Sequence, residues 1–201
     1  MEKINHQETK ENILNRIFLG FNFEEKYQDW YNSLCKDLHE KFDIEDLSKT
    51  NFFHITLKAP FKINKKDIPT LKNKLKDINI EREIIFNVDG FSYFEGKRKT
   101  VYVNTVINKD YEKDLENLLD NIKNTIGDNN DTLENSQIER NIFNMHASIA
   151  RFLSEEELEK VLDYLKNIEI PFKKIKFKKI DIYKKDSTDE VGRSGSKYDL
   201  I

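Results

Sequence analysis

A short motif that combines a histidine with a hydroxyl residue occurs twice in this chain. The copies span residues 53–57 and 145–149, and each reads apolar residue, histidine, spacer, hydroxyl residue, apolar residue. They contain His54 and His146, two of the four histidines in the chain. Residues two apart in a β-strand project from the same face, roughly 6.5 Å apart. Each copy, folded as a strand, would therefore present an imidazole and a hydroxyl to one surface.

Two imidazoles that face one another suit acid–base catalysis at a phosphodiester. The neutral histidine takes a proton from the attacking water or ribose hydroxyl, and the protonated one gives a proton to the leaving oxygen. The hydroxyls of Thr56 and Ser148 would donate hydrogen bonds to the non-bridging oxygens and stabilise the charge of the transition state. This chemistry requires no metal ion and no cofactor, and we expect neither.

A single histidine two residues from a hydroxyl residue is weak evidence, because half-buried histidines are common in strands. Two copies in similar contexts favour the catalytic interpretation. The main alternative is a non-catalytic RNA- or nucleotide-binding module, since antiparallel sheets with exposed aromatic residues can stack bases. A metallohydrolase is a further alternative, but the sequence has no His-x-His or His-Glu-x-x-His spacing, and neither motif carries an adjacent carboxylate.

The charge of the chain is nearly balanced. Its 201 residues include 34 basic and 37 acidic side chains, with a formal net charge of −3, so no overall positive field attracts nucleic acid or a membrane. An anionic substrate must then be bound by local groups. The sequence has no apolar run typical of a signal peptide or a membrane span. Because Cys35 is the single cysteine, it cannot form an internal disulfide, and we expect a cytoplasmic protein. We also expect a monomer with no obligate protein partner.

The remaining sequence predicts the elements that would position the two motifs. The predicted strands are 17–22, 52–59, 83–88, 100–107, 143–152 and 174–183. The predicted helices are 24–42, 67–78, 111–126, which Gly127 ends, and 154–167, which a Ser154 cap opens. The polar stretch 128–141 is expected to be an exposed loop or a flap over the site. This order predicts an α+β fold with antiparallel sheets and helices on their outer faces.

With these elements, the paired motifs resemble the 2H phosphoesterase superfamily, the LigT-like and cyclic-phosphodiesterase proteins whose signature is two His-x-Thr/Ser motifs. The resemblance extends over residues 16–201 and includes the run 54–61, Arg151 after the second motif, and the closing strand. It implies one bilobal domain over residues 1–201, with two related lobes of antiparallel sheet and outer helices around a central cleft. It also implies substrates with a 2′,3′-cyclic or 2′,5′-linked phosphodiester in a nucleotide or an RNA terminus. The family pattern allows Ser148 in place of threonine.

Three further residues are candidates for substrate binding, each with a structural alternative. Lys58 shares the strand parity of the first motif, so it could contact phosphate, or it could lie in solvent. Tyr102 could stack a base or be an ordinary strand residue. Arg151 could bind phosphate or pair with a glutamate of the following helix. A basic stripe on the last predicted strand could guide an RNA backbone or protect a sheet edge; it consists of Lys174, Lys176 and Lys178.

Overall fold

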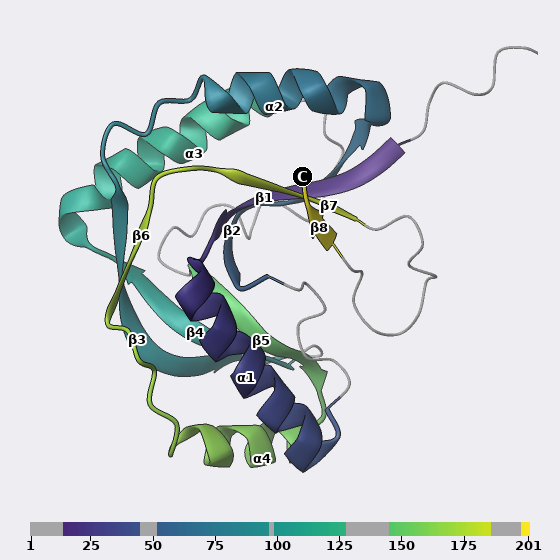
Figure 1. Ribbon diagram of the computed structural model, residues 1–201, viewed down its shortest axis with the longest axis vertical. Helices are drawn as coiled ribbons and strands as arrows, with labels where there is room; N and C mark the ends of the chain where they lie inside the picture. The colour runs from purple at the N-terminus through teal and green to yellow at the C-terminus, as the bar shows by residue number, and fades with distance from the viewer. Residues whose placement is uncertain (1–13, 45–51, 97–98, 128–144, 186–197) are drawn as a thin grey trace, which may run out of the picture.

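The computed structural model describes residues 14–44, 52–96, 99–127, 145–185 and 198–201 (Figure 1). The stretch 128–141, predicted to be a loop or flap, lies outside these residues. The strands are β1 (Leu14–Asn22), β2 (His54–Asn64), β3 (Ile84–Phe94), β4 (Lys99–Ile107), β5 (His146–Leu153), β6 (Lys174–Phe177), β7 (Asp181–Lys185) and β8 (Tyr198–Leu200). The α-helices are α1 (Glu25–Phe42), α2 (Ile68–Lys76), α3 (Glu112–Ile126) and α4 (Glu155–Leu165), and short 3-10 helices, η1 (Lys65–Asp67) and η2 (Lys109–Tyr111), precede α2 and α3.

The described strands form two four-stranded sheets in which every pairing is antiparallel. Sheet A has the order β2-β1-β7-β8, and sheet B has the order β5-β4-β3-β6. The two strands that carry the motifs, β2 and β5, each lie at the edge of their own sheet. Their neighbours, β1 and β4, also occupy equivalent places. The two sheets are therefore built on related plans, and the predicted α+β fold with two related lobes of antiparallel sheet is confirmed.

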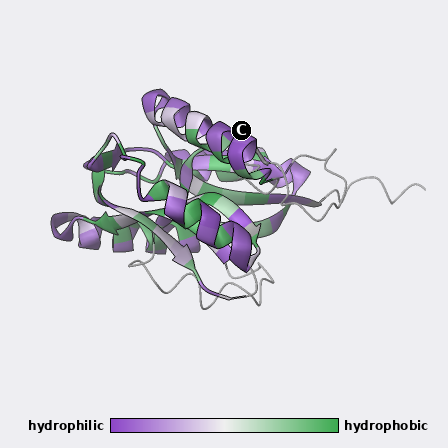
Figure 2. Ribbon diagram, turned by 90° about the horizontal axis from the view of Figure 1, so that it is seen from below, coloured by the Kyte–Doolittle hydropathy of each residue, from purple (hydrophilic) through white to green (hydrophobic). Residues whose placement is uncertain are grey.

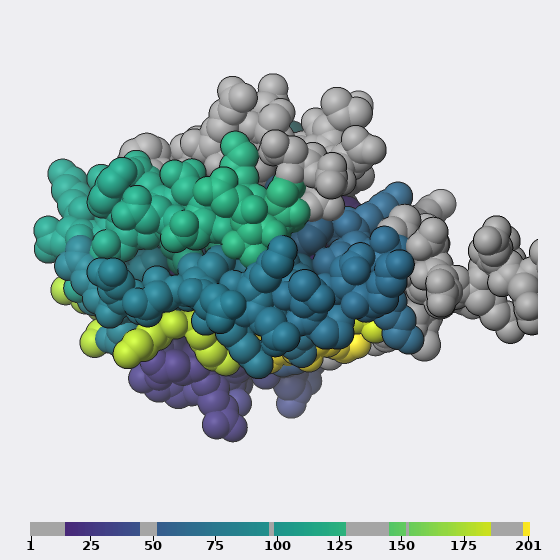
Figure 3. Space-filling view, turned by 90° about the horizontal axis from the view of Figure 1, so that it is seen from above, coloured from purple at the N-terminus to yellow at the C-terminus, as the bar shows by residue number. Residues whose placement is uncertain are grey.

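The helices pack in two pairs that each combine the two halves of the chain. α1 contacts α4, and α2 contacts α3; Figure 1 shows the two pairs at opposite ends of the molecule. Seen from the side of α2 and α3, these helices lie next to each other over one face (Figure 3). α1 connects two strands of sheet A, yet it contacts β5 of sheet B. Sheet B is thus packed against a helix that belongs, in chain order, to sheet A.

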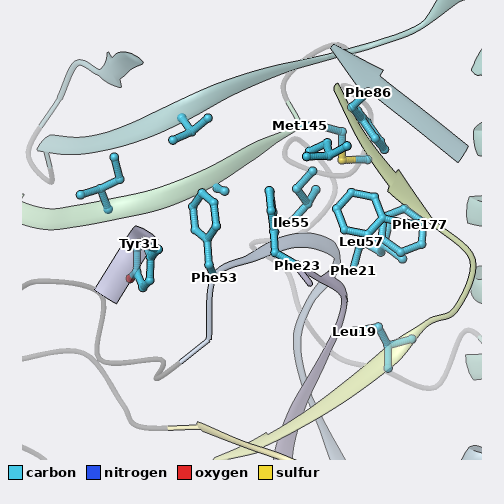
Figure 4. Packing of buried hydrophobic residues seen from close by; sticks show 14 of the residues in the cluster. Leu19, Phe21, Phe23, Tyr31, Phe53, Ile55, Leu57, Phe86, Met145 and Phe177 are labelled. Atoms are coloured by element: carbon cyan, nitrogen blue, oxygen red, sulfur yellow. The ribbon is translucent and has the colours of Figure 1, made fainter. Parts of the chain in front are cut away.

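Apolar side chains fill the region between the sheets and beneath the helices. Phe21 of β1 stacks on Phe177 of β6 with ring centroids 4.6 Å apart, and both rings pack against Phe86 of β3 (Figure 4). The helices alternate hydrophilic and hydrophobic residues along their length (Figure 2), as expected of helices with one buried face. In β1 the core contains Ile17, Leu19 and Phe21. The even-numbered side chains of β1 therefore project from the opposite face of sheet A.

The boundaries of two helices follow the predicted sequence signals. Ser154 caps α4 in a capping box, in which its hydroxyl accepts from the Glu157 backbone N–H and the Glu157 carboxylate accepts from the Ser154 N–H. α3 ends at Gly127, whose φ of 76° is a conformation that favours glycine. Both signals act within a few residues, which is why the sequence alone located them.

The predicted strand 174–183 is wrong as a single strand. Its first part is β6, at the edge of sheet B, whereas its second part belongs to β7, in the middle of sheet A. The apolar residues fall at positions 175 and 177 and then at 180 and 182, so Lys178-Lys179 interrupts the alternation at the point where the chain changes sheet. Lys174 and Lys176 are exposed on β6, and Lys176 pairs with Glu83 at 3.4 Å. An edge position favours the protective interpretation of the basic stripe, and Lys178 lies beyond the end of β6.

Candidate active site

The two motif strands bring their histidines to neighbouring parts of the two sheets. β2 and β5 contact each other across the sheets. His54 lies directly opposite Asn22 of β1, and His146 lies directly opposite Asn104 of β4. After burial, the positive charge of His146 is one of the causes that lower the pKa of the His54 imidazole. The structure therefore places the two predicted catalytic histidines close together, although their catalytic roles stay predictions.

His54 is enclosed by protein. Only 6% of its surface is exposed, and its ring lies 4.9 Å from the Phe18 ring and 5.0 Å from the Tyr183 ring, centroid to centroid. Phe18 and Tyr183 are themselves buried and stack at 4.4 Å. The pKa of His54 is lowered to about 4, chiefly by burial and in addition by the positive charges of Arg151 and His146, against the hydrogen bond to Phe52, which raises it. His54 is therefore neutral at neutral pH.

One hydrogen bond selects the tautomer of this neutral imidazole. The Nδ1 atom of His54 lies 2.8 Å from the backbone oxygen of Phe52. A carbonyl oxygen can only accept, so Nδ1 carries the proton and donates it to Phe52. Nε2 is then left with a lone pair, which is the state that a general base requires.

His146 has a more open environment. Its ring is half-buried and lies 4.7 Å from the Phe94 ring and 5.1 Å from the Tyr102 ring. Phe94 and Tyr102 pack on each other at 4.3 Å, and both are partly exposed. The structure thus places Tyr102 beside a histidine, as a residue of the site must be. Phe94 was not predicted, because the sequence pattern ended its strand at residue 88 and β3 continues to Phe94.

Thr56 lies on β2 opposite Gly20 of β1 and is half-buried. A Cβ atom at Gly20 would lie 2.6 Å from the backbone oxygen of Ile55 and 3.3 Å from the Tyr183 ring. The first of these distances is too short for any side chain, because the strand backbone cannot move aside easily. Glycine therefore permits the close approach of β1, β2 and the Tyr183 ring beside the first motif.

A β-bulge brings Arg151 back to the site. Ser148 pairs with Tyr102 and Ala150 with Val101, so one extra residue, Ile149, lies in β5 between these pairs. Such a bulge reverses the alternation of side chains along a strand. Arg151 consequently projects with Ser148, and its Nη2 donates to Ser148 Oγ at 3.1 Å. The Arg151 charge also reaches His54, so the structure brings this candidate into the site.

The position of Lys58 on β2 does not follow from the regular alternation of side chains along the strand. The pairing of β1 with β2 shifts register on both sides of Lys58, which lies opposite Leu19, a residue of the core. The parity that relates His54 to Thr56 therefore cannot be extended to position 58. Lys58 is half-buried, and its contact with substrate stays a prediction.

Neither a cluster of metal ligands nor a reactive thiol accompanies the two histidines in the described residues. In that part of the chain, no three His, Cys, Asp or Glu side chains gather as metal ligands would. Burial raises the pKa of the Cys35 thiol to about 11, so this cysteine stays protonated and supplies no thiolate. Among the described helices, none combines the length and apolar content that a membrane span requires.

Sequence reasoning missed several residues that line the histidines, namely Phe18, Gly20, Asn22, Phe94 and Tyr183. These residues form no motif and are far apart in the sequence; the sheet ladders bring them together. Strand parity was the signal that could have found some of them. Residues 18, 20 and 22 alternate with residues 17, 19 and 21 of the first strand, so they share one face of it.

Comparisons with known proteins agree with this fold. A sequence model of the 2′-5′ RNA ligase superfamily matches residues 35–189. The crystal structure of E. coli LigT complexed with 3′-AMP is 13% identical, with a TM-score of 0.56 and 96% of each chain covered. The complex of E. coli LigT with NADP+ is 14% identical, with a TM-score of 0.57, over 94% of this chain and 96% of that chain.

A further crystal structure, of a phosphoesterase, is 12% identical with a TM-score of 0.55, over 94% of this chain and 96% of that chain. At these identities the solved structures show the shared fold. A search of the curated proteins found no matching sequence. The match to the superfamily covers most of the chain, including both histidine motifs and the helices between them. The chain therefore belongs to the 2′-5′ RNA ligase superfamily, in agreement with its resemblance to the 2H phosphoesterases.

Proposed function

We propose that this protein is a metal-independent phosphodiesterase in which His54 and His146 act as an acid–base pair. The proposed substrates carry a 2′,3′-cyclic or 2′,5′-linked phosphodiester in a nucleotide or at an RNA end. Membership of the 2′-5′ RNA ligase superfamily supports phosphodiester chemistry on RNA or nucleotides in general. The observation that carries the proposal is the contact between the two edge strands that bear the motifs, which brings the two imidazoles within electrostatic reach of each other.

The environments of the two histidines suggest how they divide the work. His54 is neutral, with its proton on Nδ1, so Nε2 is available to take a proton from water or from a ribose hydroxyl. The oxygen that loses this proton bonds to phosphorus as the bond to the leaving oxygen breaks. His146 protonates the leaving oxygen. An anionic phosphate bound beside His54 would raise the pKa of the imidazole and so strengthen the base.

Ser148 and Arg151 form a small phosphate-binding unit in this proposal. Arg151 donates to the Ser148 oxygen, so the Ser148 O–H proton is not used in that bond and can be donated to a non-bridging oxygen of the substrate. The guanidinium adds a positive charge on the same side of β5. Thr56 supplies the corresponding hydroxyl from β2. Together these groups would stabilise the negative charge of the transition state.

Phe94 and Tyr102 are the proposed platform for a nucleobase. Both rings are partly exposed next to His146, and base stacking on aromatic side chains does not require a particular base. The comparison structures of E. coli LigT contain 3′-AMP and NADP+, which are nucleotides. A base on this platform would place its ribose phosphate near His146 and Ser148.

A non-catalytic RNA- or nucleotide-binding module remains the second candidate, because the partly exposed Phe94–Tyr102 pair alone would suffice for stacking.

The test is an assay of the purified protein against four substrate classes with excess EDTA. These are 2′,3′-cyclic nucleotides, 2′,5′-oligoadenylates, cyclic-phosphate RNA ends and tRNA-splicing by-products.

We expect hydrolysis of at least one class at a rate that EDTA does not change. A rate that collapses in chelator and returns with one divalent ion would contradict the metal-independent mechanism. Binding without turnover for every class would support the binding module instead. His39→Ala, which removes an exposed histidine of α1, is the matched control and should retain full activity.

A further inference from the structure

The side chain of Gln28, on α1, is held in a single orientation by the backbone of Phe53. The Phe53 N–H donates to Gln28 Oε1 at 2.6 Å, and Gln28 Nε2 donates to the Phe53 oxygen at 2.8 Å. A backbone N–H can only donate, so the Gln28 atom that faces it must be the oxygen. This settles which end of the Gln28 amide is oxygen and which is nitrogen, a distinction that shape alone does not make.

The orientation of Gln28 in turn determines that of Asn22. Gln28 Nε2 lies 2.7 Å from Asn22 Oδ1, and because Nε2 is a donor, the Asn22 atom that faces it must be the acceptor oxygen. The Asn22 amide nitrogen, Nδ2, is therefore directed away from Gln28. Among the described residues, no group accepts a hydrogen bond from Asn22 Nδ2. The Asn22 backbone is also fixed, since its N–H donates to Asp181 Oδ2 at 3.2 Å.

Asn22 lies where a donor would meet the substrate. It pairs directly with His54 in the antiparallel ladder of β1 and β2, and directly paired residues project from the same face of a sheet. Asn22 is half-buried, so its amide is neither sealed in the core nor freely solvated. Its Nδ2–H groups are thus oriented donors beside the imidazole that is the proposed base.

The equivalent position in sheet B is occupied differently. Asn104 lies opposite His146, but its Nδ2 donates to Asp89 Oδ2 at 3.4 Å on the exposed surface. One of the two N–H groups of Asn104 Nδ2 is therefore engaged by the protein. The two sheets share the arrangement of histidine opposite asparagine. Among the described residues, both N–H groups of Asn22 Nδ2 are without a protein acceptor, whereas one of those of Asn104 is bonded to Asp89.

We propose that Asn22 is a further substrate-binding residue, whose Nδ2 donates to a non-bridging oxygen of the phosphodiester, and that Gln28 positions it. This inference rests on the proposed function, because it uses a phosphodiester bound between the two histidines. A neutral donor at this point would hold the phosphate against Nε2 of His54 without adding another charge that would lower the pKa of His54 further. The chemical class of the ligand is an oxyanion of a phosphate ester.

The variants Asn22→Ala, Asn22→Asp and Gln28→Glu separate the parts of this proposal. Asn22→Ala removes the donor, and we expect kcat/KM to fall about 10- to 100-fold, as for the loss of a hydrogen bond to a charged group. Asn22→Asp keeps the acceptor for Gln28 but presents an oxygen to the phosphate, so its loss should be larger. Gln28→Glu keeps the acceptor for Phe53 N–H but removes Nε2, so the Asn22 amide should turn its nitrogen toward the new carboxylate.

Gln28→Glu should therefore lose nearly as much activity as Asn22→Ala, and combining the two substitutions should cost little more than either alone, because both remove the same donor. Asn104→Ala is the matched control in sheet B, and it should retain activity within about threefold. Thermal melting of each variant checks that the losses do not follow unfolding. Additive losses in the double variant would contradict the assignment of Gln28 as the residue that orients Asn22.

A measurement on the unmodified chain tests the donor directly. Titration with inorganic phosphate should shift the NMR signals of the Asn22 side-chain NH₂ group strongly, as expected on formation of a hydrogen bond, whereas those of Asn104 should shift much less. If Asn22→Ala stays within threefold of the parent rate while the His54 variant is inactive, the role of Asn22 is wrong and the proposed function stands. If the parent chain hydrolyses no substrate, the proposed function fails, and the phosphate titration then decides by itself whether Asn22 is an anion donor.

Discussion

The two sheets carry the same motif in different surroundings. In sheet A, His54 is buried against Phe18 and Tyr183, and its Nδ1 is bonded to a carbonyl oxygen. In sheet B, His146 is half-buried beside a pair of partly exposed rings. A related plan of strands thus produces one histidine that is held neutral and another that is more open to solvent and substrate. The motif identifies the two histidines, and the burial of the rings around them distinguishes their environments.

The residues opposite the two hydroxyls show the same contrast. Thr56 faces Gly20, and Ser148 faces Tyr102. Each histidine has one ring from the adjacent strand, Phe18 in sheet A and Tyr102 in sheet B, and one from the third strand, Tyr183 in sheet A and Phe94 in sheet B. The two rings of sheet A are buried, whereas those of sheet B are partly exposed. One lobe therefore encloses its histidine, while the other offers a surface for a ligand.

Replacing either histidine tests whether the two histidines act as one catalytic unit despite their different environments. We expect His54→Ala and His146→Ala each to lower the rate about 10²- to 10⁴-fold, because each removes a positioned acid or base. The double variant should be little slower than either single variant, since each step of the reaction requires both groups. Rates should be measured with substrate binding and thermal melting in parallel. A loss of less than about tenfold for either residue, or a loss that only follows unfolding, would show that the pair is structural.

The hydroxyls should contribute less than the histidines. Thr56→Ala and Ser148→Ala remove a hydrogen bond but leave proton transfer intact, so we expect losses on the order of 10- to 10³-fold. Thr56→Ser should retain much of the activity because the hydroxyl is preserved. Ser148→Ala also leaves Arg151 without the oxygen to which it donates, so it should lose more than Thr56→Ala. Equal activity of Thr56→Ala and the parent chain would remove Thr56 from the site.

The sequence predicted the parts of this site that depend on local pattern. His54, Thr56, His146 and Ser148 could be found because two short segments repeat, and the alternation within each strand set their common face. Arg151 was uncertain for a physical reason: the bulge at Ile149 reverses side-chain parity, and no sequence signal marks it. Pairing between distant strands is equally invisible in one sequence.

The fold, like the site, could be predicted where the signals are local and could not where they depend on pairing between distant strands. Element types and the caps at Ser154 and Gly127 follow from local signals. The change of sheet between β6 and β7 does not, because the break in the apolar alternation at Lys178-Lys179 fits a bulge within one strand as well as a passage from sheet B to sheet A. The roles of Asn22 and Gln28 depend on individual hydrogen bonds between β1, α1 and Phe53, which only the folded structure supplies.

The buried state of His54 predicts a dependence of stability on pH. Its pKa falls from 6.5 to about 4 on folding, chiefly through burial. Between these values the unfolded chain binds the proton more readily, so the free energy of unfolding should decrease as the pH falls from about 6.5 toward 4, by up to roughly 3 kcal/mol. Urea unfolding at several pH values measures this slope.

His54→Asn should flatten the slope, whereas His39→Asn, at an exposed position, should leave it nearly unchanged. An identical slope in all three proteins would mean that His54 is not held neutral by burial.

The activity of the parent chain should follow a bell-shaped pH profile, because one histidine must be neutral and the other charged. A rate that rises steadily from acid to alkaline pH would contradict the paired roles, provided that chemistry limits turnover.

The smallest expected effect separates the two aromatic pairs. Phe94 and Tyr102 are partly exposed, so Tyr102→Leu should weaken nucleotide binding, raise KM on the order of tenfold and leave kcat and the melting temperature nearly unchanged. Phe18 and Tyr183 are buried around His54, so Phe18→Leu should lower the melting temperature with little change in KM, because a stacked core contact is lost. Steady-state kinetics and thermal melting of the two variants distinguish a ring pair that binds the nucleotide from a ring pair that stabilises the fold around His54. The division between an enclosing lobe and a ligand-binding lobe would be contradicted if Tyr102→Leu destabilised the fold as much as Phe18→Leu and left KM unaltered.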